Sequence, residues 1–250
     1  MEREVFLLIK DTIKELVAKL NFSKQAISIL LKAVAVILVL GIVFWGYQTF
    51  SKPPVIPERV LDQGIKATLA AESFRFNLEY KNVTDEKEEV WSQIKGEKAG
   101  EDKIHITGEM VKTPVEIFQV GNKTYIKNPI DTWTVLDEND IHQQELLVNE
   151  INPLAIFAFK EIPEVKYKGT KELDGDEYYV IEYIPDVANQ FIEVLATDFI
   201  YKSWVNVKTN LIGKTTVEAT SRGEGKGKLF INVDFYDYKA EINLEVPKVD

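Results

Sequence analysis

Few residues of this chain have types and spacings suited to catalysis or metal binding. The sequence has no cysteine and two histidines, His105 and His142, which share no ligand-like spacing with each other or with a carboxylate cluster. Residues 137–140 (DEND) lack the glycine and the distal glutamate of a calcium-binding EF-hand loop. Residues 223–228 (GEGKGK) follow no strand-to-helix pattern and lack the ending of a phosphate-binding loop. We therefore expect no enzyme, no cofactor and no metal site.

The charge of the chain argues against nucleic acid as a partner. The sequence has 40 acidic and 30 basic residues, a formal net charge of −10 at pH 7, and the excess of acid lies after residue 50. A domain of this sign has no electrostatic footprint for a phosphate backbone or for an anionic membrane surface. We expect it to meet lipid through apolar contacts or through a membrane anchor.

The expected function is inferred instead from rows of apolar side chains. Residues 73–80 alternate between apolar and polar types, which predicts a half-buried antiparallel strand. On a curved sheet with little helical cover, such rows line a pocket for an acyl chain, whose affinity grows by about 0.8 kcal/mol per buried methylene. The alternative is an ordinary dry core. The candidate lipid-binding residues are Phe74, Phe76, Leu78, Ile106, Ile117, Phe157, Phe159, Phe191, Leu195, Val233 and Phe235.

Similar alternating stretches recur along the chain, separated by turn signals such as Gly121-Asn122. About 10 to 11 strands in sequence predict one large antiparallel sheet, which must curl and have its apolar face covered. The expected fold class is therefore α+β, a strongly curved half-barrel sheet covered by a few helices. The further strands are expected near residues 88–97, 102–111, 114–120, 123–127, 132–136, 164–172, 177–184, 203–209, 212–220 and 228–238.

Helical spacing of apolar residues predicts three helices in the same region, at residues 58–71, 140–159 and 186–199. The third is expected to point Val187, Phe191, Val194 and Leu195 inward. Together with the apolar loop at 153–159, these helices form the expected cover of the sheet.

Residues 26–47 form the longest apolar run, and Lys32 is its one charge. At about 1.5 Å per residue, a helix of this length spans roughly 33 Å, which matches a hydrocarbon core of about 30 Å. Trp45 and Tyr47 lie at its end, as in an interfacial aromatic belt. A cleaved signal peptide and a buried core helix are the alternatives. The long segment before the run disfavours the first, and its apolar character on every face disfavours the second.

Basic residues are more frequent before this run than after it, so we expect the N-terminus in the cytoplasm. The protein would then be a single-pass protein of the cytoplasmic (inner) membrane. Its C-terminal domain, preceded by the N-terminal transmembrane helix, would lie outside. Residues 2–20 carry an apolar stripe at helical spacing, which predicts an amphipathic helix that docks a membrane partner or lies in the inner headgroup layer. The expected segments are a cytoplasmic helix (1–25), an anchor (26–50), a proline-rich linker (51–56) and an extracytoplasmic domain (57–250).

Six motifs stand out in that domain: residues 70–76 (AAESFRF), 121–127 (GNKTYIK) followed by Trp133, 167–175 (YKGTKELDG), 179–186 (YVIEYIPD), 204–212 (WVNVKTNLI) and 235–244 (FYDYKAEINL). They resemble motifs of the LolA-like lipoprotein carriers, and of the LppX/LprG-type proteins in particular. The resemblance covers about residues 57–247. It implies an eleven-strand half-barrel whose cavity carries lipid, glycolipid or a lipoprotein acyl group. Those relatives are soluble or lipidated at an N-terminal cysteine, whereas this chain has no cysteine.

The sequence thus predicts a membrane-anchored extracytoplasmic protein that binds lipid or lipoprotein and catalyses no reaction. It would act as a carrier, sensor or scaffold in envelope lipid handling. The alternative is a structural or regulatory ectodomain with a filled core that acts through protein partners. The expected partners are the bilayer, a lipid, glycolipid or lipoprotein acyl ligand, and a membrane protein contacted by the 2–20 helix.

Overall fold

The computed structural model describes residues 32, 34–41, 54–128, 130–136, 152–188, 190–222 and 227–249, with the backbone alone at residues 190 and 191. The chain divides into two compact units, Met1–Pro54 and Val55–Asp250.

In the first unit, residues 34–41 are helical and their apolar side chains are exposed. Across the described ranges, no helix is both long and apolar enough to cross a bilayer. The expected span at 26–47 lies mostly outside the described residues, and the expected helix at 2–20 lies wholly outside them. The anchor and its orientation therefore stay predictions.

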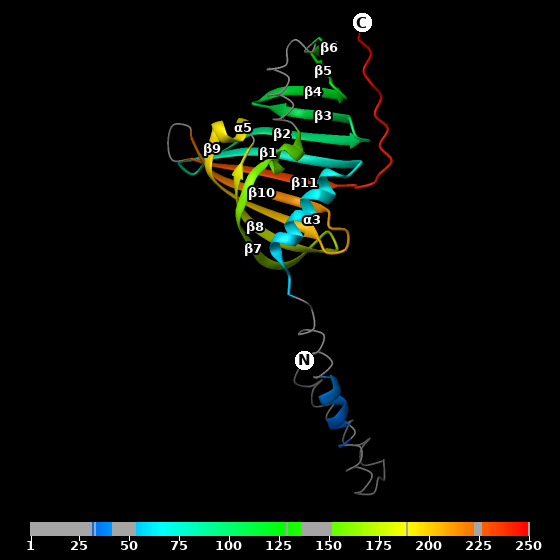
Figure 1. Ribbon diagram of the computed structural model, residues 1–250. Helices are drawn as coiled ribbons and strands as arrows, with labels where there is room; N and C mark the ends of the chain where they lie inside the picture. The colour runs from blue at the N-terminus through cyan, green and yellow to red at the C-terminus, as the bar shows by residue number, and fades with distance from the viewer. Residues whose placement is uncertain are drawn as a thin grey trace, which may run out of the picture. The chain divides into compact units, whose positions relative to one another are not determined.

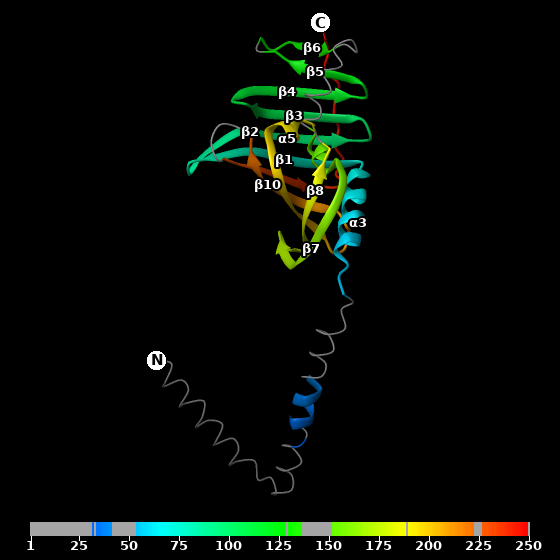
Figure 2. The same ribbon diagram turned by 60° about the vertical axis from the view of Figure 1, so that its left-hand side comes forward.

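The second unit is built on one antiparallel sheet of eleven strands, in the order β6-β5-β4-β3-β2-β1-β11-β10-β9-β8-β7. Figure 2 shows its curvature, which confirms the expected curved antiparallel sheet. Pairing of β1 with β11 joins the two halves, and β6 and β7 are the edges. The strands are β1 (Ser73–Thr84), β2 (Lys87–Ala99), β3 (Lys103–Met110), β4 (Thr113–Val120), β5 (Lys123–Lys127), β6 (Trp133–Leu136), β7 (Phe159–Leu173), β8 (Asp176–Val187), β9 (Ala196–Asn206), β10 (Ile212–Ser221) and β11 (Lys228–Tyr236).

Strand β1 shows how the sequence sets the inner face of the sheet. Its apolar residues at alternate positions are buried, and the polar residues between them are partly exposed. Phe76 lies opposite Phe235 of β11 and Gly96 of β2. A Cβ atom at Gly96 would lie 2.2 Å from the Phe76 ring, so the missing side chain lets the ring lie against the neighbouring strand.

Helix α3 (Pro57–Leu69) covers part of this inner face, as the sequence predicts. Proline at the first helical position has the φ that a helix requires. The helix packs on β7 to β10, with Leu61, Gly64 and Thr68 buried (Figure 1). The backbone N–H of Ile212 donates to Thr68 Oγ1 at 3.0 Å, which fastens the helix to the start of β10.

The predicted helix at 186–199 is wrong at both ends. Strand β8 continues to Val187, helix α5 covers only Gln190–Leu195, and β9 begins at Ala196. Val194, expected to face inward, is 74 % exposed. The strand expected near 203–209 is the second half of β9, which ends at Asn206.

Most of the predicted helix at 140–159 lies outside the described residues. Its described end is not α-helical: η2 (Pro153–Phe157) is a short 3-10 helix, and Phe159 opens β7. Asn152 Oδ1 accepts a hydrogen bond from the Leu154 N–H at 3.0 Å and caps η2. Ile156 and Phe157 are buried in the core, so the apolar loop covers the sheet as expected.

A second, smaller cluster lies on the outer face. Phe118 and Tyr125 face away from the main core, and the extended C-terminal tail places Leu244 on them. In Figure 1 this tail runs from β11 past the strands toward β6.

Candidate functional site

The structure brings the predicted lipid-binding residues together on the inner face of the sheet. Phe159 and Leu195 are partly buried and pack against this cluster, and the side chain of Phe191 lies outside the described residues. The fully buried members are Phe74, Phe76, Leu78, Ile106, Ile117, Phe157, Val233 and Phe235.

Protein atoms cover these side chains closely. Phe76 is 0 % exposed, Leu78 1 % and Phe235 4 %. Phe157 of η2 stacks on Phe235 with ring centroids 6.2 Å apart, and Phe74 meets Phe235 edge-on at 5.5 Å. A ligand therefore reaches this layer only if a covering element moves, and η2, α3 and α5 each place side chains in this buried cluster.

The predicted Phe159 of β7 packs with a second group of aromatic side chains, Tyr183 of β8 and Phe199 and Tyr201 of β9, which the sequence reasoning missed. Phe159 packs edge-on against Tyr201 and Tyr183, with centroids 5.2 and 5.7 Å apart. Tyr183 and Tyr201 lie 5.3 Å from each other, and Phe199 lies 6.4 Å from Tyr201. The predicted helix at 186–199 hid the start of β9, whose alternation would have placed Tyr201 and Ser203 inward.

Hydroxyl groups occupy the middle of this otherwise apolar region. The Tyr183 hydroxyl lies 3.1 Å from Ser203 Oγ, which lies 2.9 Å from Thr215 Oγ1. The Tyr201 hydroxyl is buried and has no hydrogen-bond partner within the part of the chain that the structure describes. An unpaired buried polar group costs about 1–3 kcal/mol. Burial also raises the pKa of both tyrosines, so their hydroxyls stay protonated at neutral pH.

One lysine lies on the inner face and already has partners. Lys98 Nζ donates to the carbonyl oxygens of Ala71 at 2.7 Å and Gly100 at 2.8 Å, and it lies 5.9 Å from the Phe74 ring centroid. Burial lowers the pKa of this ammonium. Because Ala71 follows the C-terminus of α3, Lys98 links the end of that helix to β2.

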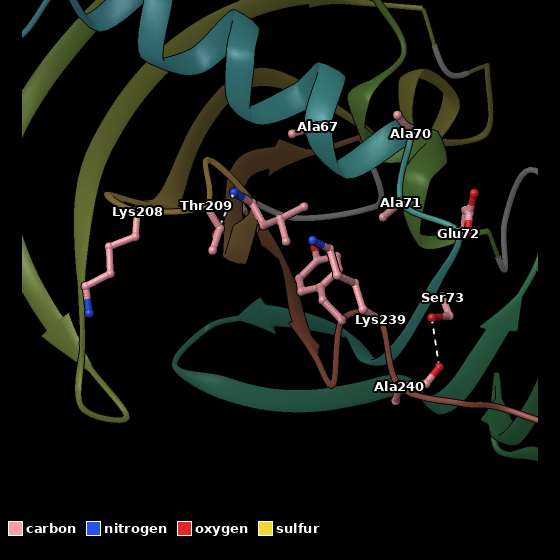
Figure 3. Close-up of a pocket in the computed structure, with 11 residues that line it drawn as sticks. Ala67, Ala70, Ala71, Glu72, Ser73, Lys208, Thr209, Lys239 and Ala240 are labelled. Carbon is pink, nitrogen blue, oxygen red and sulfur yellow. Dashed lines mark hydrogen bonds between the residues drawn. The ribbon is translucent and has the colours of Figure 1, made fainter.

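The second unit has several hollows. The one drawn in Figure 3 has a volume of about 930 Å³ and is lined by the end of α3, the β9–β10 turn and the chain after β11. Its wall is mixed, with Ala67 and Ala70 on one side and Lys208 and Lys239 among the others. None of the predicted lipid-binding residues lines it, and Phe235 alone among them lines a neighbouring hollow of about 720 Å³.

Residues suited to acid–base chemistry are not gathered there. His105 Nε2 lies 3.2 Å from Glu116 Oε1 on the outer face, with both side chains partly exposed. Among the described residues no cluster of three His, Asp or Glu side chains is arranged to hold a metal. His142, residues 137–140 and residues 223–226 lie outside the described ranges.

Comparison with known proteins identifies the fold. No protein-family model matches the sequence, and no curated protein matches it. The lipoprotein LppX from Mycobacterium tuberculosis matches in structure with a TM-score of 0.51 and 13 % identity, covering 75 % of this chain and 97 % of LppX. LprF from Mycobacterium bovis matches with a TM-score of 0.51 and 11 % identity, covering 79 % of this chain and 99 % of LprF.

A LolA superfamily protein from Nitrosomonas europaea also matches, at 11 % identity over 78 % of this chain and 96 % of that protein, but its TM-score is 0.34. The assignment therefore relies on the two mycobacterial structures. The second unit of this chain has the fold seen in LppX and LprF.

Proposed function

We propose that residues 57–250 bind a lipid or an acyl chain on the inner face of the curved sheet, without catalysis. The observation that carries the proposal is the gathering of the apolar residues predicted from sequence into one layer on that face. The fold shared with the lipoprotein LppX supports it, because the resemblance seen in the sequence implies a lipid-carrying cavity.

Binding on this face requires the cover to open. The inner layer is closed by protein atoms, so a chain of methylenes must replace contacts made by η2 or α3. Each buried methylene contributes about 0.8 kcal/mol, so a long acyl chain offsets the loss of several aromatic contacts. The domain would therefore open on binding and close when empty.

The anchor belongs to the same proposal. A single transmembrane helix at 26–47, with the N-terminus in the cytoplasm, would hold the domain beside the outer surface of the membrane. Such a fixed tether favours local lipid handling, sensing or a scaffold role over transport across the envelope. Protease added to spheroplasts is expected to remove residues 55–250 and to spare the N-terminal segment, whereas protection of the whole chain would overturn this orientation.

A second function has one observation in its favour. The same closed layer, with Phe76 and Val233 at 0 % exposure, is what a partner-binding ectodomain with a filled core would show. Transfer of a fluorescent acyl lipid from vesicles to the delipidated 55–250 domain separates the two. Saturable transfer supports lipid binding, and its absence favours the filled core.

A further inference from the structure

Side chains with hydroxyl groups lie next to one another on the inner face, on the three consecutive strands β8, β9 and β10. Tyr201 of β9 lies opposite Tyr183 of β8 and Val217 of β10. One step along the same strands, Ser203 lies opposite Ile181 and Thr215. Tyrosine, serine and threonine side chains therefore form a polar spot within an apolar layer.

Three of these hydroxyl groups are hydrogen-bonded to one another, whereas the Tyr201 hydroxyl is not part of this chain of hydrogen bonds. Tyr183, Ser203 and Thr215 form a chain with oxygen distances of 3.1 and 2.9 Å. The Tyr201 hydroxyl is buried without a partner within the described residues, although its ring lies beside that of Tyr183. A phenolic hydroxyl has one proton to donate and can also accept. Among the described residues, the Tyr201 hydroxyl is therefore a fully buried donor without an acceptor.

Phe159 packs against the aromatic ring that carries this hydroxyl. Its ring packs edge-on against Tyr201 and Tyr183, and its own side chain is only partly buried. Phe159 is the first residue of the edge strand β7, where the pairing with β8 is irregular between Phe159 and Glu161 and again between Glu161 and Glu164. A weakly paired edge position can move at low cost, because few ladder hydrogen bonds must break.

We propose that the Tyr201 hydroxyl is the polar recognition point of the lipid site, donating a hydrogen bond to the carbonyl oxygen of an acyl ester when the Phe159 ring moves aside. The inference rests on the proposed lipid-binding function and adds the ligand's chemistry to it. Apolar contacts alone do not fix how far a chain slides along the inner face. A single buried donor does, because it is paired only when the ester carbonyl reaches it.

The test compares two lipids that differ only in their two ester carbonyl groups. The purified full-length chain, in detergent, is offered equal amounts of dioleoyl phosphatidylcholine and its dialkyl ether analogue, and native mass spectrometry reads the ratio bound. We expect the wild-type chain to prefer the diester by about tenfold or more, as one buried hydrogen bond of about 1.4 kcal/mol would give. Tyr201→Phe should bind both lipids with no preference.

The matched control is Tyr167→Phe, which removes the hydroxyl of an exposed tyrosine that is hydrogen-bonded to Thr170. This variant should keep the wild-type preference for the diester. A diacylated lipopeptide as third competitor distinguishes a lipoprotein source of the ester from a phospholipid source. Preference over the diether is expected in either case.

Phe159→Leu provides a second arm that leaves the Tyr201 hydroxyl in place. A smaller cover should speed uptake of the diester several-fold while the preference over the diether remains. Binding without preference in the wild type, or a preference that survives in Tyr201→Phe, would overturn this inference and leave the proposed function standing. Failure of the wild type to bind either lipid would count against the proposed function itself.

Discussion

The contact between Phe76 and Gly96 gives a quantitative test of how closely the inner face is packed. Phe76 is 0 % exposed, and its ring lies 2.2 and 2.4 Å from the place where a Cβ atom on Gly96 would be. Phe76→Ala removes a fully buried ring and should reduce the free energy of unfolding by about 3–5 kcal/mol. Gly96→Ala adds a methyl group that collides with the ring and should cost about 1–3 kcal/mol.

The double variant should cost less than the sum of the two single changes. Once the ring is absent, the methyl group added by Gly96→Ala has space and fills part of the cavity, although the His105 carbonyl oxygen would still lie 3.0 Å from it. We expect a favourable coupling of at least about 1 kcal/mol, within the range found for residues in contact.

Thermal and urea unfolding of the delipidated 55–250 domain measures all three variants. For a domain of this size, Phe76→Ala should lower Tm by about 6–20 °C. Tyr236→Ala, beside Phe235 but exposed on the outer face, is the control and should change Tm by no more than about 2 °C. Additive effects of the two changes, or a Phe76→Ala shift below about 3 °C, would mean that the ring lines open space, and the packing described here would be refuted.

Three other changes test separate parts of the domain. Val111→Asn should stabilise it by about 0.5–1 kcal/mol, seen as a higher Tm, because Val111 is a β-branched residue held at φ +47° in a hairpin turn; an unchanged or lower Tm would argue against that turn. Leu244→Ala should cost about 1–3 kcal/mol in urea unfolding by uncovering the outer-face cluster, and a loss under about 0.5 kcal/mol would mean that the tail does not pack there. Burial raises the pKa of Glu182, but Lys168 and Lys202 lower it by more, so the net pKa is depressed. The stability from these two ion pairs, under about 1 kcal/mol, is therefore present at neutral pH and lost as pH falls through that pKa. Glu182→Gln should lose less stability than wild type between about pH 5 and 3; equal losses would contradict this.

Much of the sheet could be predicted because its signal is local. The alternation in β1 and the turn signals between strands gave the number and approximate positions of the strands, and the residues on one side of β1 are the buried ones. That alternation also placed Phe76 and Phe235 on the same face, where they pair.

The error between 186 and 199 shows where local pattern fails. Val187, Val194 and Leu195 have helical spacing, but in a segment this short the same residues also suit a strand end and a single helical turn. Pairing of β8 with β7 and β9 decides the outcome, and that pairing is not local. The unpaired hydroxyl of Tyr201 was equally beyond sequence reasoning, because the neighbours Tyr183, Val217 and Phe159 come from three other strands.

The outer-face cluster was missed for a related reason. The sequence places Phe118 opposite the inner face, where a solvated side chain is expected. Its burial depends on Leu244, more than a hundred residues later, in a tail that has no regular secondary structure.

Native mass spectrometry of the 55–250 domain, purified without detergent, tests the central claim most directly. The account predicts a mass increment of a bound lipid, which organic extraction removes and incubation with vesicles restores. A domain that carries no lipid as purified, and takes none up after incubation, would contradict it.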